Sequence, residues 1–122
     1  MAEEQMWTIE FYRREDGTSP VTEFLETLDK ETRARFDWSI EQLRVRNIQA
    51  SEPLVRHLEG TIWELRRESS TNIYRLFYSL LSGRRILFVH GFAKKTQKLP
   101  TRELEVARRR LARFEEREGG EE

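Results

Sequence analysis

Three short apolar runs follow one another between residues 62 and 92, and this feature constrains the fold of the chain most. They cover residues 62–66, 73–81 and 85–92. A polar gap separates the first two runs, and a Ser82-Gly83 turn separates the second from the third. Short connections of this kind join antiparallel strands, so the pattern predicts a meander. The third run is apolar at four successive positions, 86–89, which predicts a central strand with both faces covered.

The segment before the meander predicts one strand and two helices. Residues 7–11 alternate apolar and polar side chains, as a half-buried strand does. Ser19 and Pro20 suit the N-cap and the first turn of a helix, and apolar residues then recur at helical spacing up to Leu28. Asp29 suits a second cap, and a second helical stripe continues to about Asn47. These two helices are expected to form a hairpin.

Loops and one further helix account for the rest of the chain. Residues 50–60, with Pro53 and Gly60, predict a loop, and residues 93–99 predict a second, lysine-bearing loop. Pro100 opens a last helix, in which apolar residues recur from Leu104 to Phe114. The charged, glycine-containing segment 115–122 is expected to fray.

The sequence therefore predicts a single α+β domain over residues 1–122, with a folded core of about residues 6–114 and a charged tail at 115–122. Its expected order is β-α-α-β-β-β-α. A mainly antiparallel sheet would pack against the N-terminal helical hairpin and the C-terminal helix. The first strand is expected to pair at the edge with the last strand of the meander.

Charge is distributed unevenly along this chain of zero formal net charge. Residues 62–98 contain 8 Lys and Arg but only 2 Asp and Glu, whereas residues 1–61 contain 8 and 13. The predicted sheet is thus basic, and a basic sheet suits a polyphosphate ligand such as RNA. The alternative is that these cations decorate a solvated face and pair with acidic helices.

Composition excludes several classes of chemistry. The chain has no cysteine and only two histidines, His57 and His90, so disulfides and thiolate catalysis are excluded and a zinc site is not expected. No metal or other cofactor is expected. The acidic N-terminus lacks a signal pattern and no apolar run could span a bilayer, so we expect a cytoplasmic protein that does not bind membranes.

Three motifs in order give the chain a resemblance to a known family. They are Trp63-Glu64-Leu65-Arg66, then Tyr74-Arg75-Leu76-Phe77-Tyr78, then His90-Gly91-Phe92-Ala93-Lys94-Lys95-Thr96-Gln97-Lys98 before a final helix. Over about residues 6–114 the chain resembles the RelE/ParE toxin superfamily, and within it the phage-derived HigB-type branch. The resemblance implies the toxin of a type II toxin–antitoxin pair, acting as a ribosome-dependent mRNA endonuclease that inhibits translation. It also implies a helix-turn-helix antitoxin as partner and an oligomer formed through that antitoxin.

The chain departs from this family at two places. Well-known RelE-like members carry lysines where Ile62 and Glu64 stand here, and a tyrosine near the position of Thr101. HigB-type relatives often lack these residues too. The family resemblance therefore holds, but the general acid and base stay unassigned.

The reaction implied is attack of the RNA 2′-OH on the adjacent phosphorus. Fixed cations stabilise the charge that develops on the phosphate. Arg66 and Arg75 are the first catalytic candidates, because an arginine within an apolar strand needs a ligand, a carboxylate partner or an open face. Glu64 is a substrate-binding candidate that shares a face with Arg66, so a structural ion pair of Glu64 with Arg66 or Arg75 is the alternative.

The lysine-bearing loop supplies the other candidates. Lys94 and Lys95 are predicted as catalytic cations, and Thr96 and Lys98 as substrate-binding residues. The alternative is a loop that only keeps a strand end hydrated.

Further residues are more readily explained by structure than by catalysis. We expect Trp7, Trp63 and Tyr78 in the core, and His90 as a hydrogen-bonded core histidine. The arginines at 108–110 are expected on a solvated helix face, with ribosomal RNA binding as a second interpretation.

Two other functions fit the same fold. One is a non-catalytic RNA- or ribosome-binding module. The other is a ParE-like toxin, a branch of the superfamily that is thought to act on gyrase.

Overall fold

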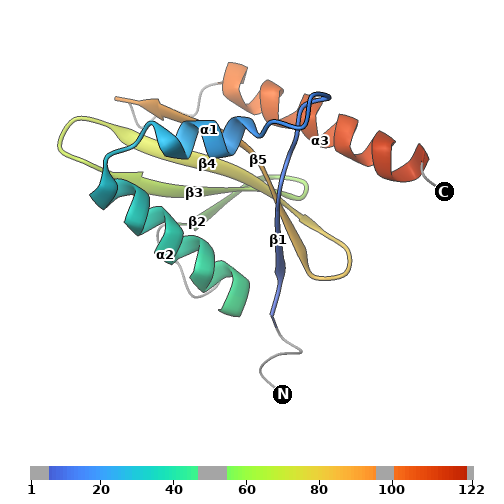
Figure 1. The fold of residues 1–122 in the computed structure, drawn as a ribbon, viewed down its shortest axis with the longest axis horizontal. Helices are drawn as coiled ribbons and strands as arrows, with labels where there is room; N and C mark the ends of the chain where they lie inside the picture. Colours follow the sequence, from blue (N-terminus) through green and yellow to red (C-terminus); the bar gives the residue numbers. More distant parts are fainter. Residues whose placement is uncertain (1–5, 47–54, 96–100, 121–122) are drawn as a thin grey trace.

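A computed structural model of the chain describes residues 6–46, 55–95 and 101–120. Within these ranges the chain forms five strands and three helices (Figure 1). In chain order they are β1 (Thr8–Phe11), α1 (Pro20–Glu26), α2 (Lys30–Arg46), β2 (Val55–Glu59), β3 (Ile62–Glu68), β4 (Ile73–Leu81), β5 (Arg85–Lys94) and α3 (Thr101–Gly120).

The strands form one sheet in the order β1-β5-β4-β3-β2. β2 to β5 pair antiparallel in chain order, which confirms the predicted meander. β1 pairs with β5, as predicted, and the pairing is parallel. Parallel neighbours require a long crossover, and here the connection contains α1, α2 and the rest of the sheet.

The helices α1 and α2 cover one face of the sheet (Figure 1). Ser19 caps α1 by accepting a hydrogen bond from the Thr22 amide at 3.1 Å, and the Asp29 carboxylate accepts one from the Thr32 amide at 3.2 Å. These caps confirm the predicted helix starts. The core on this face contains the buried residues Val21, Leu25, Phe36, Leu43, Val55, Leu65, Leu76, Tyr78, Ile86 and Phe88.

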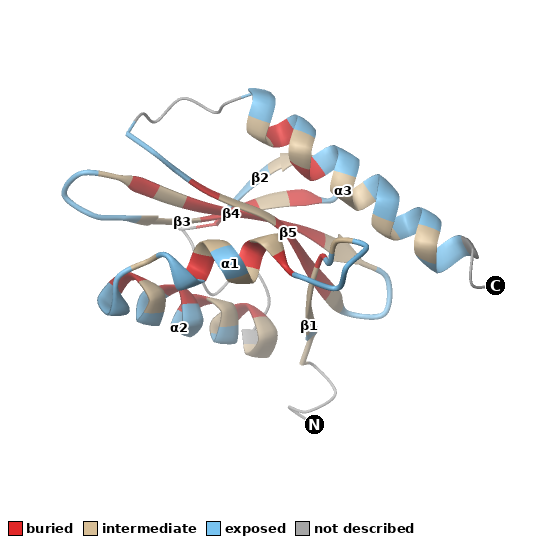
Figure 2. Ribbon diagram, turned by 45° about the horizontal axis from the view of Figure 1, so that its top comes forward, coloured by how far each residue is buried: buried red, intermediate tan, exposed pale blue. Residues whose placement is uncertain are grey.

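The helix α3 covers the opposite face, which we call the α3 face (Figure 2). Leu104 and Ala107 bury the inner side of α3 against β4 and β5, while its outer side is exposed. The buried residues of this second core are Tyr12, Ile62, Phe77, Leu87, Val89, Phe92, Leu104 and Ala107. Because each face of the sheet has its own core, β4 and β5 carry apolar residues at both odd- and even-numbered positions.

The predicted loop over residues 50–60 is wrong for its second half, because residues 55–59 form β2. Only Val55 of this edge strand is fully buried, and Arg56 and His57 are exposed, so its sequence carries no clear alternation. The predicted order therefore lacks one strand. β5 also continues to Lys94, two residues beyond the predicted end at Phe92.

The expected fraying from residue 115 is also wrong as far as Gly120, because α3 continues to that residue. Its last turns are held by contacts to distant segments. The Arg117 guanidinium donates to the Arg13 carbonyl at 2.6 Å, and Glu118 pairs with Arg85 at 2.5 Å. Long-range partners of this kind are not visible in the local composition.

Candidate functional site

The strand register gathers most of the predicted site residues on the α3 face. Glu64 lies opposite Phe77, which lies opposite His90, and in the next row Arg66 lies opposite Arg75, which lies opposite Phe92. Residues directly opposite each other share a face. A third row contains Glu68, Ile73 and Lys94. The cations come from three neighbouring strands about 5 Å apart. Arg66 of β3 and Lys94 of β5 are separated by two strand spacings and one row, which places their backbones about 12 Å apart.

Glu64 is the centre of the first group of charges. Its side chain is almost fully buried, and its two oxygens face different arginines: Oε1 lies 3.1 Å from Arg75 Nε, and Oε2 lies 2.8 Å from Arg56 Nη2. The ion pair of Glu64 with Arg75 is the structural alternative raised by the sequence. Arg56, on β2, was not anticipated, because its strand was not predicted.

Arg75 is fully buried. Its guanidinium carbon lies 6.0 Å from the centroid of the Phe92 ring, in addition to the ion pair with Glu64. Burial lowers the pKa of Arg75, Glu64 opposes this effect, and the charges of Arg56 and Arg66 add to the lowering. Three arginines therefore share the region around one buried carboxylate, and Arg75 is held inside the protein in this conformation.

The more accessible cations lie around this buried pair. Arg66 is 28% exposed and lies 3.7 Å from the Glu68 carboxylate. Lys94 is 43% exposed, at the end of β5, and Lys95 follows it as an exposed residue. Thr96 and Lys98, the other two predicted substrate-binding residues, lie outside the described residues.

His90 belongs to a second, adjoining group. Its Nε2 lies 2.6 Å from Glu103 Oε1, and its Nδ1 lies 3.1 Å from Arg110 Nη1. The ring packs against both Phe77 and Phe92, with centroid distances of 6.2 Å and 5.3 Å. Burial lowers the pKa of His90; the hydrogen bond to Glu103 opposes this, and the charge of Arg110 adds to the lowering. His90 is thus the hydrogen-bonded core histidine that was expected.

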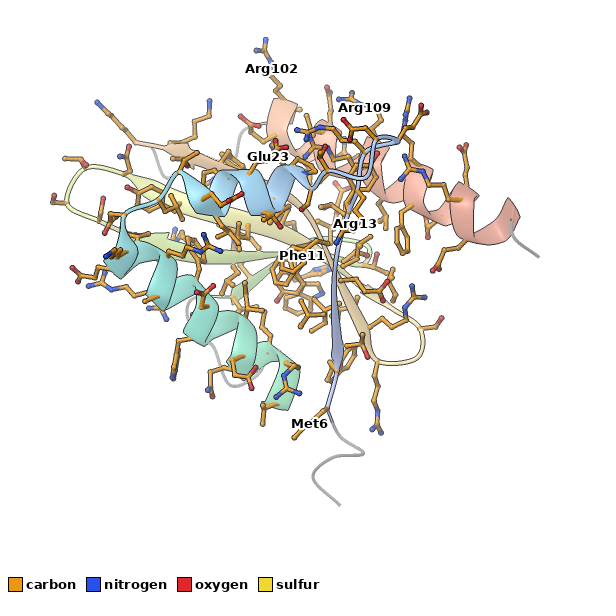
Figure 3. All side chains as sticks on the ribbon, in the orientation of Figure 1. Met6, Phe11, Arg13, Glu23, Arg102 and Arg109 are labelled. Atoms are coloured by element: carbon orange, nitrogen blue, oxygen red, sulfur yellow. The ribbon has the colours of Figure 1, made fainter. Side chains whose placement is uncertain are left out.

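The arginines of α3 do not all lie on a solvated face, so that prediction needs correction. Arg108 forms a bidentate ion pair with Glu59 of β2, at 2.7 and 2.5 Å. Arg110 turns inward and donates to the Val89 carbonyl at 2.9 Å. Arg109 is exposed and points away from the sheet (Figure 3). Helical periodicity separates these three neighbours by about 100° each, which gives them different surroundings.

Of the three aromatic residues expected in the core, Tyr78 is fully buried there. Trp7 and Trp63 are partly buried and pack against the core beneath α1 and α2. Burial raises the pKa of the Tyr78 phenol, whose oxygen has no hydrogen-bond partner among the described residues. His57 lies against Trp63, with its Nε2 2.8 Å from the Gly60 carbonyl oxygen, so it supports the β2–β3 turn.

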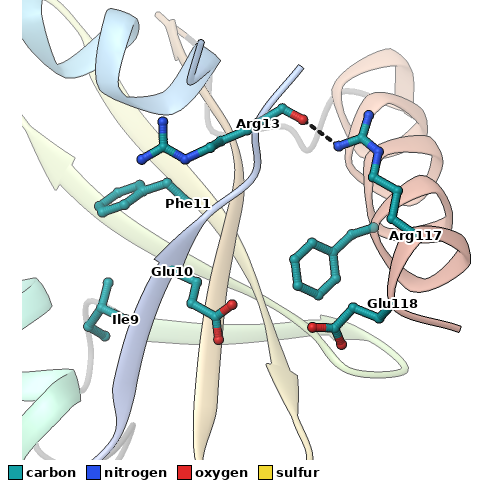
Figure 4. Close-up of a pocket in the computed structure, with 7 residues that line it drawn as sticks. Ile9, Glu10, Phe11, Arg13, Arg117 and Glu118 are labelled. Atoms are coloured by element: carbon teal, nitrogen blue, oxygen red, sulfur yellow. Dashed lines mark hydrogen bonds between the residues drawn. The ribbon is translucent and has the colours of Figure 1, made fainter. Parts of the chain in front are cut away.

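A cavity of about 460 Å³ lies apart from these charged groups (Figure 4). It is formed by β1 and the C-terminal part of α3, and it is lined by Ile9, Glu10, Phe11, Arg13, Phe114, Arg117 and Glu118. Glu118 pairs with Arg85 at the start of β5, whereas Glu103 lies beside Lys94 at its end. The cavity and the predicted site are therefore at opposite ends of α3.

The described residues contain no group of three His, Asp or Glu side chains that could hold a metal ion. They also contain no helix of the length and apolarity needed to cross a membrane.

The fold and the charged α3 face define a small α+β domain whose central sheet carries clustered cations beneath a C-terminal helix. Residues 23–112 match the model of the phage-derived Gp49-like protein family (DUF891), and the chain belongs to this family. It is a family of RelE/HigB-like toxins, associated with toxin–antitoxin pairs in which the toxin partners with an antitoxin. Comparison with curated proteins gives no match.

Proposed function

We propose that this protein is the toxin of a type II toxin–antitoxin pair, of the HigB type, that cleaves mRNA on the ribosome without a metal ion. The observation that carries the proposal is the register that places Arg66, Arg75 and Lys94 on one face of the sheet. Membership of a toxin family supports it independently. The site would act on a phosphodiester by attack of the 2′-OH on the adjacent phosphorus, which breaks the bond from phosphorus to the 5′-oxygen and expels that oxygen as the leaving group.

In this mechanism the exposed cations bind the scissile phosphate. Arg66 reaches it from β3, and Lys94 and Lys95 reach it from the end of β5. Fixed positive charges bind the phosphate more strongly as negative charge develops in the transition state, and removing one such group lowers the rate by about 10²- to 10³-fold. Thr96 and Lys98 stay predictions for substrate binding.

Arg75 and Glu64 have a different role in the proposal. The fully buried Arg75 holds Glu64, and Glu64 in turn holds the half-exposed Arg56. We therefore assign to Arg75 the positioning of the charged group, and direct phosphate contact would require its guanidinium to leave this pair. A partner antitoxin would inhibit the toxin by covering the α3 face or by keeping it from the ribosome.

The test is a reconstituted translation reaction with primer extension on the message, with and without EDTA. Wild-type protein should produce codon-specific breaks that EDTA leaves intact. Arg66→Ala and Lys95→Ala should lower the cleavage rate about 10²-fold or more. Arg35→Ala is the matched control, because it removes an exposed arginine from α2 on the other face of the sheet. Equal rates in all four proteins would overturn the site, and absence of breaks would overturn the nuclease.

One observation favours a second candidate, a non-catalytic ribosome-binding module. Glu64 is almost fully buried with an arginine beside each of its carboxylate oxygens, and both ring nitrogens of His90 have partners, so neither group is presented to the 2′-OH of a substrate in this conformation. Ribosome binding and translation arrest without breaks in the message would support this candidate. Altered plasmid supercoiling in treated cells would instead indicate a gyrase-directed toxin.

A further inference from the structure

A network of four side chains connects the side of α3 that faces the sheet to the exposed lysine at the end of β5. Arg110 donates from Nη1 to the Val89 carbonyl and reaches His90 Nδ1 at 3.1 Å. His90 Nε2 lies 2.6 Å from Glu103 Oε1. The other carboxylate oxygen, Oε2, lies 3.5 Å from Lys94 Nζ.

Arg110 fixes the direction of the hydrogen bonds made by His90 in this network. A guanidinium has only donors, so His90 Nδ1 must accept and therefore carries no proton. The proton of the neutral ring is then on Nε2, which donates to Glu103 Oε1. A charged imidazole would place an N–H against the Arg110 guanidinium, so the geometry keeps the ring neutral.

This arrangement fixes the carboxylate of Glu103 in one orientation. Its side chain is only 16% exposed, and Oε1 is held by His90 while Oε2 faces Lys94. A lysine has a flexible four-carbon chain, and an exposed one has no preferred position. Glu103 therefore gives the Lys94 ammonium a definite place over the end of the sheet, in the row next to Arg75 and Phe92.

We propose that Glu103 is a positioning residue of the RNA-cleaving site, which places Lys94 against the scissile phosphate and is itself oriented by His90 and Arg110. This inference rests on the function proposed above. It gives α3 a direct part in the site, through a carboxylate that the sequence did not single out.

A carboxylate beside a phosphate-binding site has a second, purely electrostatic effect. It repels RNA, so its removal by itself should strengthen binding. Glu103→Gln separates the two effects, because the amide oxygen can still accept from His90 while the amide nitrogen cannot accept from Lys94. If Glu103 positions Lys94, this variant should bind at least as well as wild type, with KM equal or lower, and kcat should fall about 10- to 100-fold.

The test is a double-mutant cycle in the translation-dependent cleavage assay, with wild type, Lys94→Ala, Glu103→Gln and the double variant. Because Glu103 acts through Lys94, adding Glu103→Gln to Lys94→Ala should change kcat less than twofold. The same substitution in a Lys95→Ala background should still lower kcat by its full factor. Arg35→Ala is the unaffected control, and thermal unfolding checks that each variant is folded.

Arg110→Met provides a second variant that leaves Glu103 and Lys94 in place. Without the donor to Nδ1, the imidazole is free to take either tautomer, which the nitrogen-15 shifts of His90 report directly. Wild-type protein should show a protonated Nε2 only, and the variant should show both forms with a lower kcat.

The outcomes separate the two proposals. Independent, multiplicative effects of Glu103→Gln and Lys94→Ala, or an unchanged kcat in Glu103→Gln, would overturn the positioning role while leaving the nuclease in place. A wild-type His90 protonated on Nδ1 would overturn it as well. A wild-type protein that makes no breaks in the message would overturn the proposed function, and the positioning role with it.

Discussion

Replacing Glu64 by glutamine should destabilise the protein more than any other loss of a single charge on the sheet. The carboxylate is almost fully buried between Arg75 at 3.1 Å and Arg56 at 2.8 Å. Glu64→Gln keeps the size of the side chain but leaves the fully buried Arg75 without its ion pair to this residue. Breaking a buried ion pair from one side costs about 3–5 kcal/mol.

This cost is a large part of the stability of a domain of this size, which is about 5–15 kcal/mol. It corresponds to a Tm lower by roughly 12–20 °C, because about 1 kcal/mol shifts the Tm of a chain of this length by roughly 4 °C. Urea unfolding followed by tryptophan fluorescence measures the free energy of unfolding directly. Glu68→Gln is the matched control: its carboxylate is 52% exposed and lies 3.7 Å from Arg66, so the loss should stay below about 1 kcal/mol.

A third variant separates the charge from the packing. Glu64→Leu combined with Arg75→Met replaces the pair by apolar side chains of similar size, and such replacements of buried pairs are often neutral or stabilising. The double variant should therefore regain most of the stability that Glu64→Gln loses. If Glu64→Gln unfolds within about 1 kcal/mol of wild type, the reasoning about the buried pair is refuted.

Three further outcomes follow from single positions. Gly91→Ala should lower the free energy of unfolding by about 1–3 kcal/mol, because a Cβ there would lie 2.5 Å from Phe24 Cδ2 and 3.0 Å from Leu76 Cδ2. Gly119→Ala is the control, because a Cβ at that position meets open space and should cost no stability. Urea unfolding compares the two variants. Tyr78→Phe should leave the free energy of unfolding unchanged or raise it by up to about 1 kcal/mol, since it removes a buried hydroxyl that lacks a partner among the described residues. Because the pKa of His90 is lowered in the fold, its neutral form contributes stability above the ordinary histidine pKa of about 6.5, and this contribution is lost as pH falls below that value. The charged groups that face the ring are Glu103 and Arg110. The difference in free energy of unfolding between wild type and His90→Gln should therefore shrink as pH falls from about 7.5 to about 5. A difference that stays constant over this range would contradict the prediction.

The sequence predicts the elements whose apolar residues repeat with a clear period. The two capped helices and the three long strands are where the pattern places them, and β1 pairs with β5 as expected. β2 was missed because an edge strand with one buried side chain has no readable alternation. The end of α3 was missed because its anchors, Arg13 and Arg85, are far away in sequence.

The candidate site likewise has one part that the sequence predicts and one part that it does not. The period of two in a strand is enough to infer that Glu64 and Arg66 share a face, whereas the position of Arg75 opposite Arg66 depends on the register between β3 and β4. The network of Arg110, His90 and Glu103 could not be found in this way. Glu103 and Arg110 belong to a helix whose composition predicts a solvated surface, and only the packing of α3 across β5 brings them to His90.

The parallel pairing of β1 with β5 has a consequence for synthesis of the chain. Glu10 and Arg85 are joined by hydrogen bonds across 75 positions, and Arg13 and Arg117 across 104. At about 5–20 residues per second, β1 must wait roughly 4–15 s for the strand that completes it. A nascent chain interrupted before β5 lacks the strand that pairs with β1, and it also lacks Lys94, so an incomplete copy cannot assemble the proposed site.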